Sequence, residues 1–156
     1  MQHSSGFLKL VNDAKSPVRE ISVEEVRAKQ ERNESFSFVD VREDTEWSQG
    51  HAAGAMHLGK GVIERDIEGL IPNKDAEVVL YCGGGYRSAL AAEAIQRMGY
   101  SRVSSMRAGS RPGATAGWLR EEPAQGRVAE AQVEHLLELG EGHVDLLEEA
   151  GAPEYR

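Results

Sequence analysis

The chain has 156 residues, of which 40% are hydrophobic and 28% are charged, and its formal net charge at pH 7 is −8. This size and composition are typical of one soluble globular domain with a few terminal helices outside it. The negative charge argues against a nucleic-acid partner or an anionic membrane surface, because both bind basic protein surfaces. No apolar run approaches the roughly 20 residues that span a bilayer.

The N-terminus and the cysteine content indicate a cytoplasmic protein. The first 20 residues lack a charged start followed by an apolar core, so we expect no secretory signal. The single cysteine, Cys82, allows no internal disulfide and fits a reducing compartment. One cysteine and five scattered histidines form no metal-ligand pattern, so we expect neither a metal nor another cofactor.

The N-terminal third begins with two predicted helices. Ser22 and Glu25 have the spacing of a capping box, which predicts a helix over residues 23–32. Before it, a short helix is expected to pack on the domain through apolar residues. These are Phe7, Leu8, Leu10 and Val11.

Strands and helices then alternate along the chain. Gly50 is expected to end one of the helices in a left-handed conformation. This alternation predicts right-handed crossover connections, and therefore an α/β fold in which helices cover both faces of a parallel sheet. The predicted strands are 36–41, 55–58, 76–82 and 101–106, and the predicted helices lie within 42–50, 61–70 and 87–99.

The pattern weakens after residue 107. Residues 107–118 contain several glycines and a proline and are predicted to be a loop. Two acidic amphipathic helices are expected near 127–139 and 142–150, and they offer a plausible homodimer surface. The predicted organisation is an N-terminal extension (1–19), a central domain (20–122) and a C-terminal helical extension (123–156).

The chemistry-bearing part of the chain is the segment around Cys82. This cysteine follows a buried strand, and ligands collect at the carboxyl ends of strands in a parallel sheet. The glycines that follow, Gly83, Gly84 and Gly85, let backbone amides curl inward as an anion-binding nest. The next helix adds the positive end of its dipole, and Arg87 adds a permanent charge. All these features favour a thiolate, which is the nucleophilic form.

Two other interpretations of this segment compete with a reactive thiolate. A lone cysteine at the end of a buried strand is more often a small apolar filler. Three successive glycines, however, lose much conformational entropy on folding, which an inert loop avoids. The phosphate-binding patterns Gly-x-x-x-x-Gly-Lys-Ser/Thr and Gly-x-Gly-x-x-Gly are not found at this loop or after the first strand. The combination therefore favours a reactive Cys82.

Three segments, 38–58, 78–100 and 103–106, resemble the rhodanese family of single-domain sulfurtransferases. They carry an Asp-x-Arg strand end, a Gly-His-x-x-Gly-Ala segment and the loop from cysteine to arginine, and the resemblance covers about residues 20–107. It implies a rhodanese-like central sheet and a persulfide on Cys82. The thiolate attacks the outer sulfur of a donor such as thiosulfate, releases sulfite, and passes the sulfur to cyanide or a cellular thiol. The backbone amides from Gly83 to Arg87 are implied to hold the terminal sulfur.

Two alternative functions stay open. Phosphatases and arsenate reductases that resemble this fold use a loop one residue longer than the six residues from Cys82 to Arg87. The shorter ring of amides suits one sulfur atom better than a tetrahedral oxyanion. A non-catalytic binding or sensor module is the other alternative. The altered segment 107–118, with Arg107 where the family usually has an acidic residue, favours it, and the intact Cys82 argues against it.

The resemblance also assigns supporting roles at the end of the first strand. Asp40 is implied to tie down the active loop, and Arg42 to face the mouth of the site and attract anionic donors. The alternative for Arg42 is a surface salt bridge with Glu43 or Glu46, which contributes little.

His51 and Tyr86 complete the set of candidate site residues. His51 is expected to fix its own turn by bonding backbone rather than to shuttle protons. Tyr86 is expected to point over the pocket or into solvent, and its amide matters more than its ring.

Overall fold

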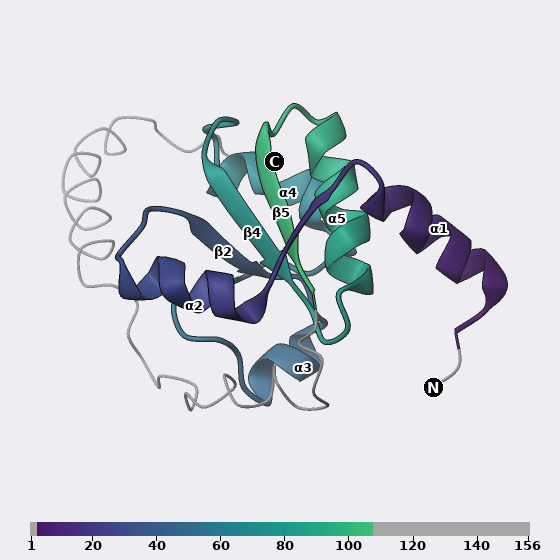
Figure 1. The fold of residues 1–156 in the computed structure, drawn as a ribbon, viewed down its shortest axis with the longest axis horizontal. Coiled ribbons are helices and arrows are strands. Elements are labelled where there is room, and N and C mark those ends of the chain that lie inside the picture. Colours follow the sequence, from purple (N-terminus) through teal and green to yellow (C-terminus); the bar gives the residue numbers. More distant parts are fainter. Residues whose placement is uncertain (1–2, 108–156) are drawn as a thin grey trace, which may run out of the picture. The chain divides into compact units, whose positions relative to one another are not determined.

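The computed structural model describes residues 3–107, which form an α/β fold around a five-stranded, all-parallel sheet of order β1-β5-β4-β2-β3 (Figure 1). This part confirms the predicted fold class. The segments predicted to form C-terminal helices and a dimer surface, and residues 108–118 of the predicted loop, lie outside the described residues. The strands are β1 (Arg19–Ile21), β2 (Ser37–Asp40), β3 (Met56–His57), β4 (Glu77–Tyr81) and β5 (Arg102–Met106), and the helices are α1 (Ser5–Lys15), α2 (Val23–Glu31), α3 (Asp44–Ser48), α4 (Ile63–Leu70) and α5 (Tyr86–Arg97).

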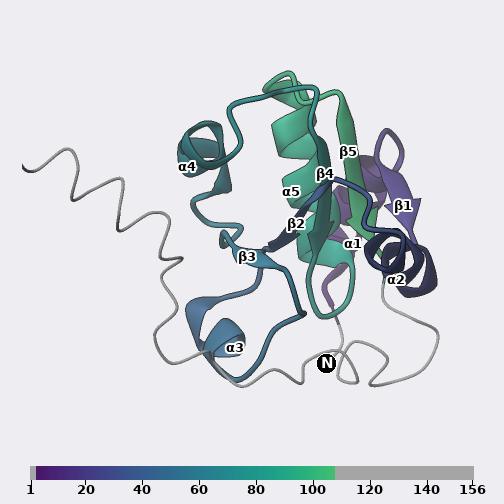
Figure 2. The ribbon, with the colours of Figure 1, turned by 90° about the vertical axis from the view of Figure 1, so that its left-hand side faces the viewer.

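Strand β4 lies at the centre of the sheet, and this position explains why the sequence of β4 is continuously apolar. Val78 and Leu80 pack into the core beneath α4 and α5, whereas Val79 and Tyr81 pack into the core beneath α2. Figure 2 shows α4 and α5 on one side of the sheet and α2 on the other. Because both faces are covered, every residue from Val78 to Tyr81 is fully buried, as is usual for parallel strands.

Local signals near the helix ends are confirmed. The Ser22 hydroxyl accepts from the Glu25 amide at 3.1 Å, and the Glu25 carboxylate accepts from the Ser22 amide at 2.7 Å. These reciprocal bonds form the predicted capping box of α2. Gly50, which follows the C-cap residue Gln49 of α3, has φ 128° and is therefore left-handed as expected.

The N-terminal helix forms and packs on the domain as expected, but of its four expected apolar contacts only Val11 is fully buried. Helix α1 packs against α5 and buries Val11 and Ala14. Leu10 is 57% exposed and Leu8 is also exposed. The buried face therefore follows the spacing of Val11 and Ala14, three residues apart, rather than the run of larger apolar residues.

Strand β1 was not predicted from the sequence. Only Ile21 of its three residues is buried, so the sequence shows no alternation. It pairs in parallel with β5, with Ile21 opposite Met106. A single buried residue gives no two-residue periodicity that the sequence could reveal. This edge strand forms because its backbone pairs with the neighbouring strand β5.

Two negative findings concern the same part of the chain. Within residues 3–107, no helix combines the length and apolar character that a bilayer crossing needs. The histidine, cysteine and acidic side chains in this range form no group of three that could bind a metal ion.

Candidate active site

Cys82 lies directly after β4, and three residues separate it from the start of α5. Its side chain is a free thiol with only 2% of the residue exposed. The Gly85 amide donates a hydrogen bond to Sγ at 3.1 Å. An amide at a helix start that points at sulfur stabilises negative charge there, so the loop supports a nucleophilic sulfur.

Two buried serines extend this environment and were missed in the sequence. The Ser105 hydroxyl of β5 donates to the Ser88 hydroxyl at 2.9 Å. Ser88 Oγ lies 3.6 Å from Cys82 Sγ, so the Ser88 hydroxyl can donate its own proton when the sulfur is a thiolate. The signal for Ser88 was its place in the first turn of α5, whereas Ser105 is revealed only by the pairing of β4 with β5.

The three loop glycines are not equivalent. Gly85 has φ 77° and lies in the left-handed region, which a residue with a Cβ adopts only with strain. A Cβ on Gly83 would meet Arg87 Nη2 at 3.9 Å, and a Cβ on Gly84 would meet Tyr86 Cδ2 at 3.9 Å. Both distances are ordinary contacts. Of the three glycines, only Gly85 combines a positive φ with an amide bonded to Sγ.

Arg87 pairs with Glu46 of α3 through two hydrogen bonds. Nη1 donates to Oε2 at 2.5 Å and Nη2 donates to Oε1 at 2.9 Å, in the fork geometry typical of strong arginine–carboxylate pairs. Hydrogen bonding from Arg87 lowers the pKa of Glu46 to about 2. The pair connects α3 to the start of α5, and most of the charge of Arg87 is already balanced.

This pair predicts a loss of stability in acid. A carboxylate with a lowered pKa stabilises the fold fully above its unfolded pKa, near 4.5, and loses that contribution as the pH falls toward about 2. A shift of this size corresponds to about 3 kcal/mol, which solvent screening at a side chain 35% exposed reduces to about 1 kcal/mol. In denaturant unfolding, Glu46→Gln should therefore be less stable than wild type at neutral pH by about 1 kcal/mol. The two proteins should converge near pH 2, and an equal gap at both pH values would contradict the prediction.

Asp40 and Arg42 form a buried pair, which corrects both expectations for them. The Arg42 guanidinium is turned inward and donates to Asp40 through Nη2 at 2.6 Å and Nε at 3.0 Å. Arg42 thus neither faces the mouth of the site nor forms a surface salt bridge. Burial is the largest single influence and lowers the pKa of Arg42, but the hydrogen bonds and negative charge of Asp40, together with Tyr81, outweigh it and raise that pKa overall.

Asp40 holds the neighbouring strand and segment rather than the active loop. The Tyr81 hydroxyl donates to Asp40 Oδ2 at 2.6 Å and accepts from the Ala52 amide at 3.0 Å. Arg42 Nη2 also donates to the Gly50 carbonyl at 2.8 Å. Burial raises the pKa of Tyr81 well above its ordinary value, so its hydroxyl stays a donor. The network therefore joins β2, β4 and the chain after α3.

His51 contacts the protein as expected. Its Nδ1 lies 3.3 Å from the Trp47 carbonyl, and its ring stacks on the Trp47 ring at 3.4 Å between centroids. The Trp47 ring also stacks with the ring of His57, at 4.9 Å between centroids. These contacts fix the turn after α3, and they are consistent with packing roles for His51 and Trp47.

Tyr86 takes a third position that the sequence did not suggest. Its ring points neither over Cys82 nor freely into solvent, but contacts α1 and the residues before it. The ring centroid lies 6.0 Å from that of Phe7 and 5.0 Å from that of His3, both edge-on. Lys15 Nζ lies 5.5 Å from the same centroid. These partners are far from Tyr86 in the sequence, so no local pattern could have revealed them.

A groove of about 1090 Å³ lies beside this site, between the ends of β2 and β3 and helix α4. None of the residues from Cys82 to Arg87 lines it. Both polar and apolar residues line the groove, and Arg65 is already paired with Asp66 at 2.6 Å. Its connection with the site is Glu43, which lines the groove and lies 3.9 Å from Arg87.

Comparison with known proteins adds a family and several relatives. The rhodanese-like domain family matches residues 22–112. The putative sulfur carrier protein YrkF of Bacillus subtilis is 32% identical over 96 residues, which are 62% of this chain and 51% of YrkF. The putative sulfurtransferase YtwF of the same organism is 33% identical over 87 residues, 56% of this chain and 82% of YtwF. The chain thus spans about half of the first relative and most of the second.

One further relative and one solved structure complete the comparison. The thiosulfate sulfurtransferase PspE of Escherichia coli is 31% identical over 68 residues, 44% of this chain and 65% of PspE. A protein of unknown function from Rhodopseudomonas palustris, described as a possible tyrosine phosphatase, superposes with a TM-score of 0.64 at 25% identity. The superposition covers 76% of this chain and 96% of that one.

Proposed function

Because the chain belongs to the rhodanese-like domain family, we propose that it is a sulfurtransferase that carries sulfur as a persulfide on Cys82. The sulfur comes from a small donor of the thiosulfate type and passes to a thiol or to cyanide. The observation that carries the proposal is the position of Cys82 Sγ at the start of α5, where the Gly85 amide donates a hydrogen bond to it. The description of PspE as a thiosulfate sulfurtransferase supports the donor class.

The chemistry takes place in two nucleophilic steps. In the first, the Cys82 thiolate attacks the outer sulfur of thiosulfate, the S–S bond of the donor breaks, and sulfite leaves with its electron pair. In the second, an acceptor thiolate or cyanide attacks the outer sulfur of the persulfide, and the Cys82 thiolate leaves. The Gly85 amide and the Ser88 hydroxyl stabilise the negative charge on sulfur in both steps.

A phosphatase is the second candidate, because the Rhodopseudomonas palustris protein is described as a possible tyrosine phosphatase. Phosphate transfer needs an arginine fork free to hold a dianionic group. Here the fork of Arg87 is occupied by Glu46, and the loop from Cys82 to Arg87 has six residues. Both observations favour sulfur over phosphate as the cargo.

The test is the mass of the intact protein after incubation with thiosulfate. Wild type should gain the mass of one sulfur atom, and Cys82→Ser should gain none, because the persulfide forms on that sulfur. Reduction with a thiol should remove the added mass. A folded wild type that stays unloaded would sink the proposal in favour of a non-catalytic binding module.

Wild type and Cys82→Ser also distinguish a sulfurtransferase from a phosphatase. An aryl phosphate should be turned over no faster by wild type than by Cys82→Ser. Hydrolysis that depends on Cys82, with no sulfur loading, would replace the proposal with phosphate chemistry. Rates of sulfur transfer to cyanide and to several thiols then define the acceptor.

A further inference from the structure

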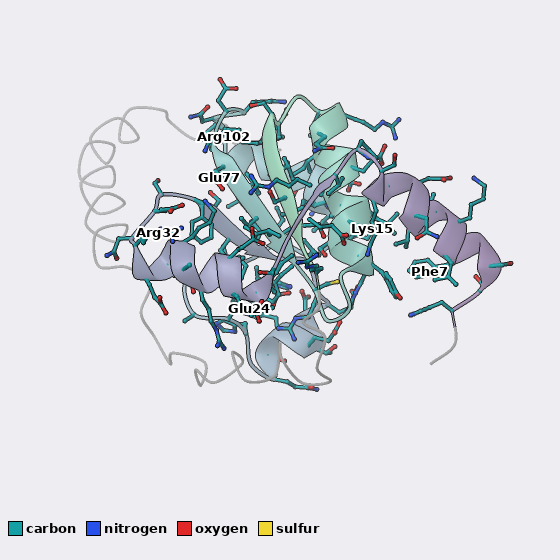
Figure 3. All side chains as sticks on the ribbon, in the orientation of Figure 1. Phe7, Lys15, Glu24, Arg32, Glu77 and Arg102 are labelled. Atoms are coloured by element: carbon teal, nitrogen blue, oxygen red, sulfur yellow. The ribbon has the colours of Figure 1, made fainter. Side chains whose placement is uncertain are left out.

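Helix α1 lies outside the matched family domain, which begins at residue 22, and yet it reaches the active loop. Phe7 and Lys15 both project from this helix (Figure 3). The ring centroids of Phe7 and of His3, which precedes the helix, lie 5.1 Å apart, and both rings contact the ring of Tyr86 edge-on. We call the cluster of His3, Phe7 and Tyr86 the aromatic wall.

The aromatic wall borders the exposed part of the loop. Gly83 and Gly84 are exposed, whereas Cys82 and Gly85 are buried. A Cβ on Gly84 would stand 3.9 Å from Cδ2 of Tyr86, so the edge of the Tyr86 ring lies beside Gly84. We call the exposed side of Gly83 and Gly84 the open glycine face. A molecule that approaches the loop over Gly84 therefore meets an aromatic surface.

The opposite side of the loop is polar. A Cβ on Gly83 would stand 3.9 Å from Nη2 of Arg87, whose guanidinium is held by Glu46. The open glycine face thus lies between an ion pair from α3 and α5 and an aromatic wall to which α1 contributes Phe7, the residues before α1 contribute His3, and α5 contributes Tyr86. A small inorganic ion needs neither side, but an organic molecule can use both.

The aromatic wall keeps surface free and adds little net charge. Phe7 and Tyr86 are each half-buried, so part of each ring remains accessible. Lys15, whose ammonium lies over the Tyr86 ring, is paired with Glu20 at 2.9 Å. Recognition on this side is therefore by contact with an apolar or aromatic group rather than by charge.

We propose that the aromatic wall is an acceptor-selecting surface that favours organic thiols with an aromatic body over cyanide. The inference rests on the proposed function and adds a class of acceptor to it. Phe7 contacts the organic body of the acceptor, and Tyr86 places that contact beside the loop. Cyanide has no such body and receives its sulfur without touching the wall.

The experiment measures the second step alone, on full-length protein. Wild type and Phe7→Ala are loaded with thiosulfate, loading is verified by mass, and transfer to benzyl mercaptan and to cyanide is timed. Phe7→Ala should lower kcat/KM for benzyl mercaptan by about five- to tenfold. Transfer to cyanide and the extent of loading should stay unchanged.

Two matched variants show whether Phe7 acts by contact or only through the fold. Leu10 lies on the same helix but is 57% exposed, and Leu10→Ala should change the rate of sulfur transfer to neither acceptor. Phe7→Leu keeps bulk without the ring and should give an intermediate loss with benzyl mercaptan alone.

Each remaining outcome decides between the two proposals. An equal fall for both acceptors in Phe7→Ala, or no fall for either, overturns the aromatic wall while sulfur transfer stands. A wild type that cannot be loaded overturns the proposed function, and the aromatic wall falls with it.

Discussion

Replacing Asp40 by alanine should lower the free energy of unfolding by about 3–5 kcal/mol, because it leaves the buried guanidinium of Arg42 without its carboxylate. Asp40 is fully buried and Arg42 is 6% exposed, so solvent cannot take over the lost hydrogen bonds without a rearrangement. The Tyr81 hydroxyl loses its acceptor at the same time. Denaturant unfolding at neutral pH measures the effect.

A matched variant separates the charge from the hydrogen bond. Tyr81→Phe keeps the ring and the ion pair, removes the hydroxyl and leaves the Ala52 amide unsatisfied, so it should cost about 1–3 kcal/mol. A loss below about 1 kcal/mol in Asp40→Ala would mean that Arg42 swings out to water.

The Asp40→Ala variant also tests what Asp40 does for the active site. Its side chain holds β4 and the turn after α3 rather than the active loop. The folded fraction of Asp40→Ala should therefore still load sulfur per molecule as wild type does. Folded protein that fails to load would restore a direct role for Asp40 at the loop.

Replacing Gly85 by alanine should impair both stability and sulfur loading. The residue has φ 77°, where a Cβ costs about 1–2 kcal/mol. If the backbone relaxes to relieve this strain, the Gly85 amide moves away from Sγ and the sulfur loses a donor. Because such a donor stabilises developing charge, the rate of persulfide formation should fall by about tenfold to a hundredfold.

Gly84→Ala is the matched control for this prediction. Its new Cβ meets Tyr86 Cδ2 at an ordinary 3.9 Å, so stability should change by no more than about 0.5 kcal/mol. Unfolding curves and the time course of loading by mass compare the two variants. Equal losses in both would mean that the loop needs glycine for its overall flexibility rather than for one left-handed residue.

Much of the fold follows from patterns within short windows of sequence. The continuous apolar run before Cys82 predicted a central parallel strand, and β4 is buried on both faces. Ser22 and Glu25, three residues apart, predicted the start of α2. In the site, the position of Cys82 before glycines and a helix start was sufficient to propose a nucleophile. These signals are readable because the residues that make each contact are near neighbours in the chain.

The orientation of the site's side chains was not predictable in the same way. Arg42 was expected at the mouth of the site, but it turns inward because Asp40, Tyr81 and the chain after α3 meet around it. Tyr81 lies 41 residues from Asp40, and the same separation divides Arg87 from Glu46.

The order of amino acids thus determined most of the elements and the parallel sheet, and it identified Cys82 as the candidate nucleophile, since propensity, periodicity and helix capping act over a few residues. Tertiary structure alone decided that Gly85 is the glycine that matters, that Ser105 backs the sulfur, and that α1 meets Tyr86. The physical reason is that a side chain's partners are set by strand register and helix packing. These bring together residues from distant segments whose own sequences carry no trace of one another.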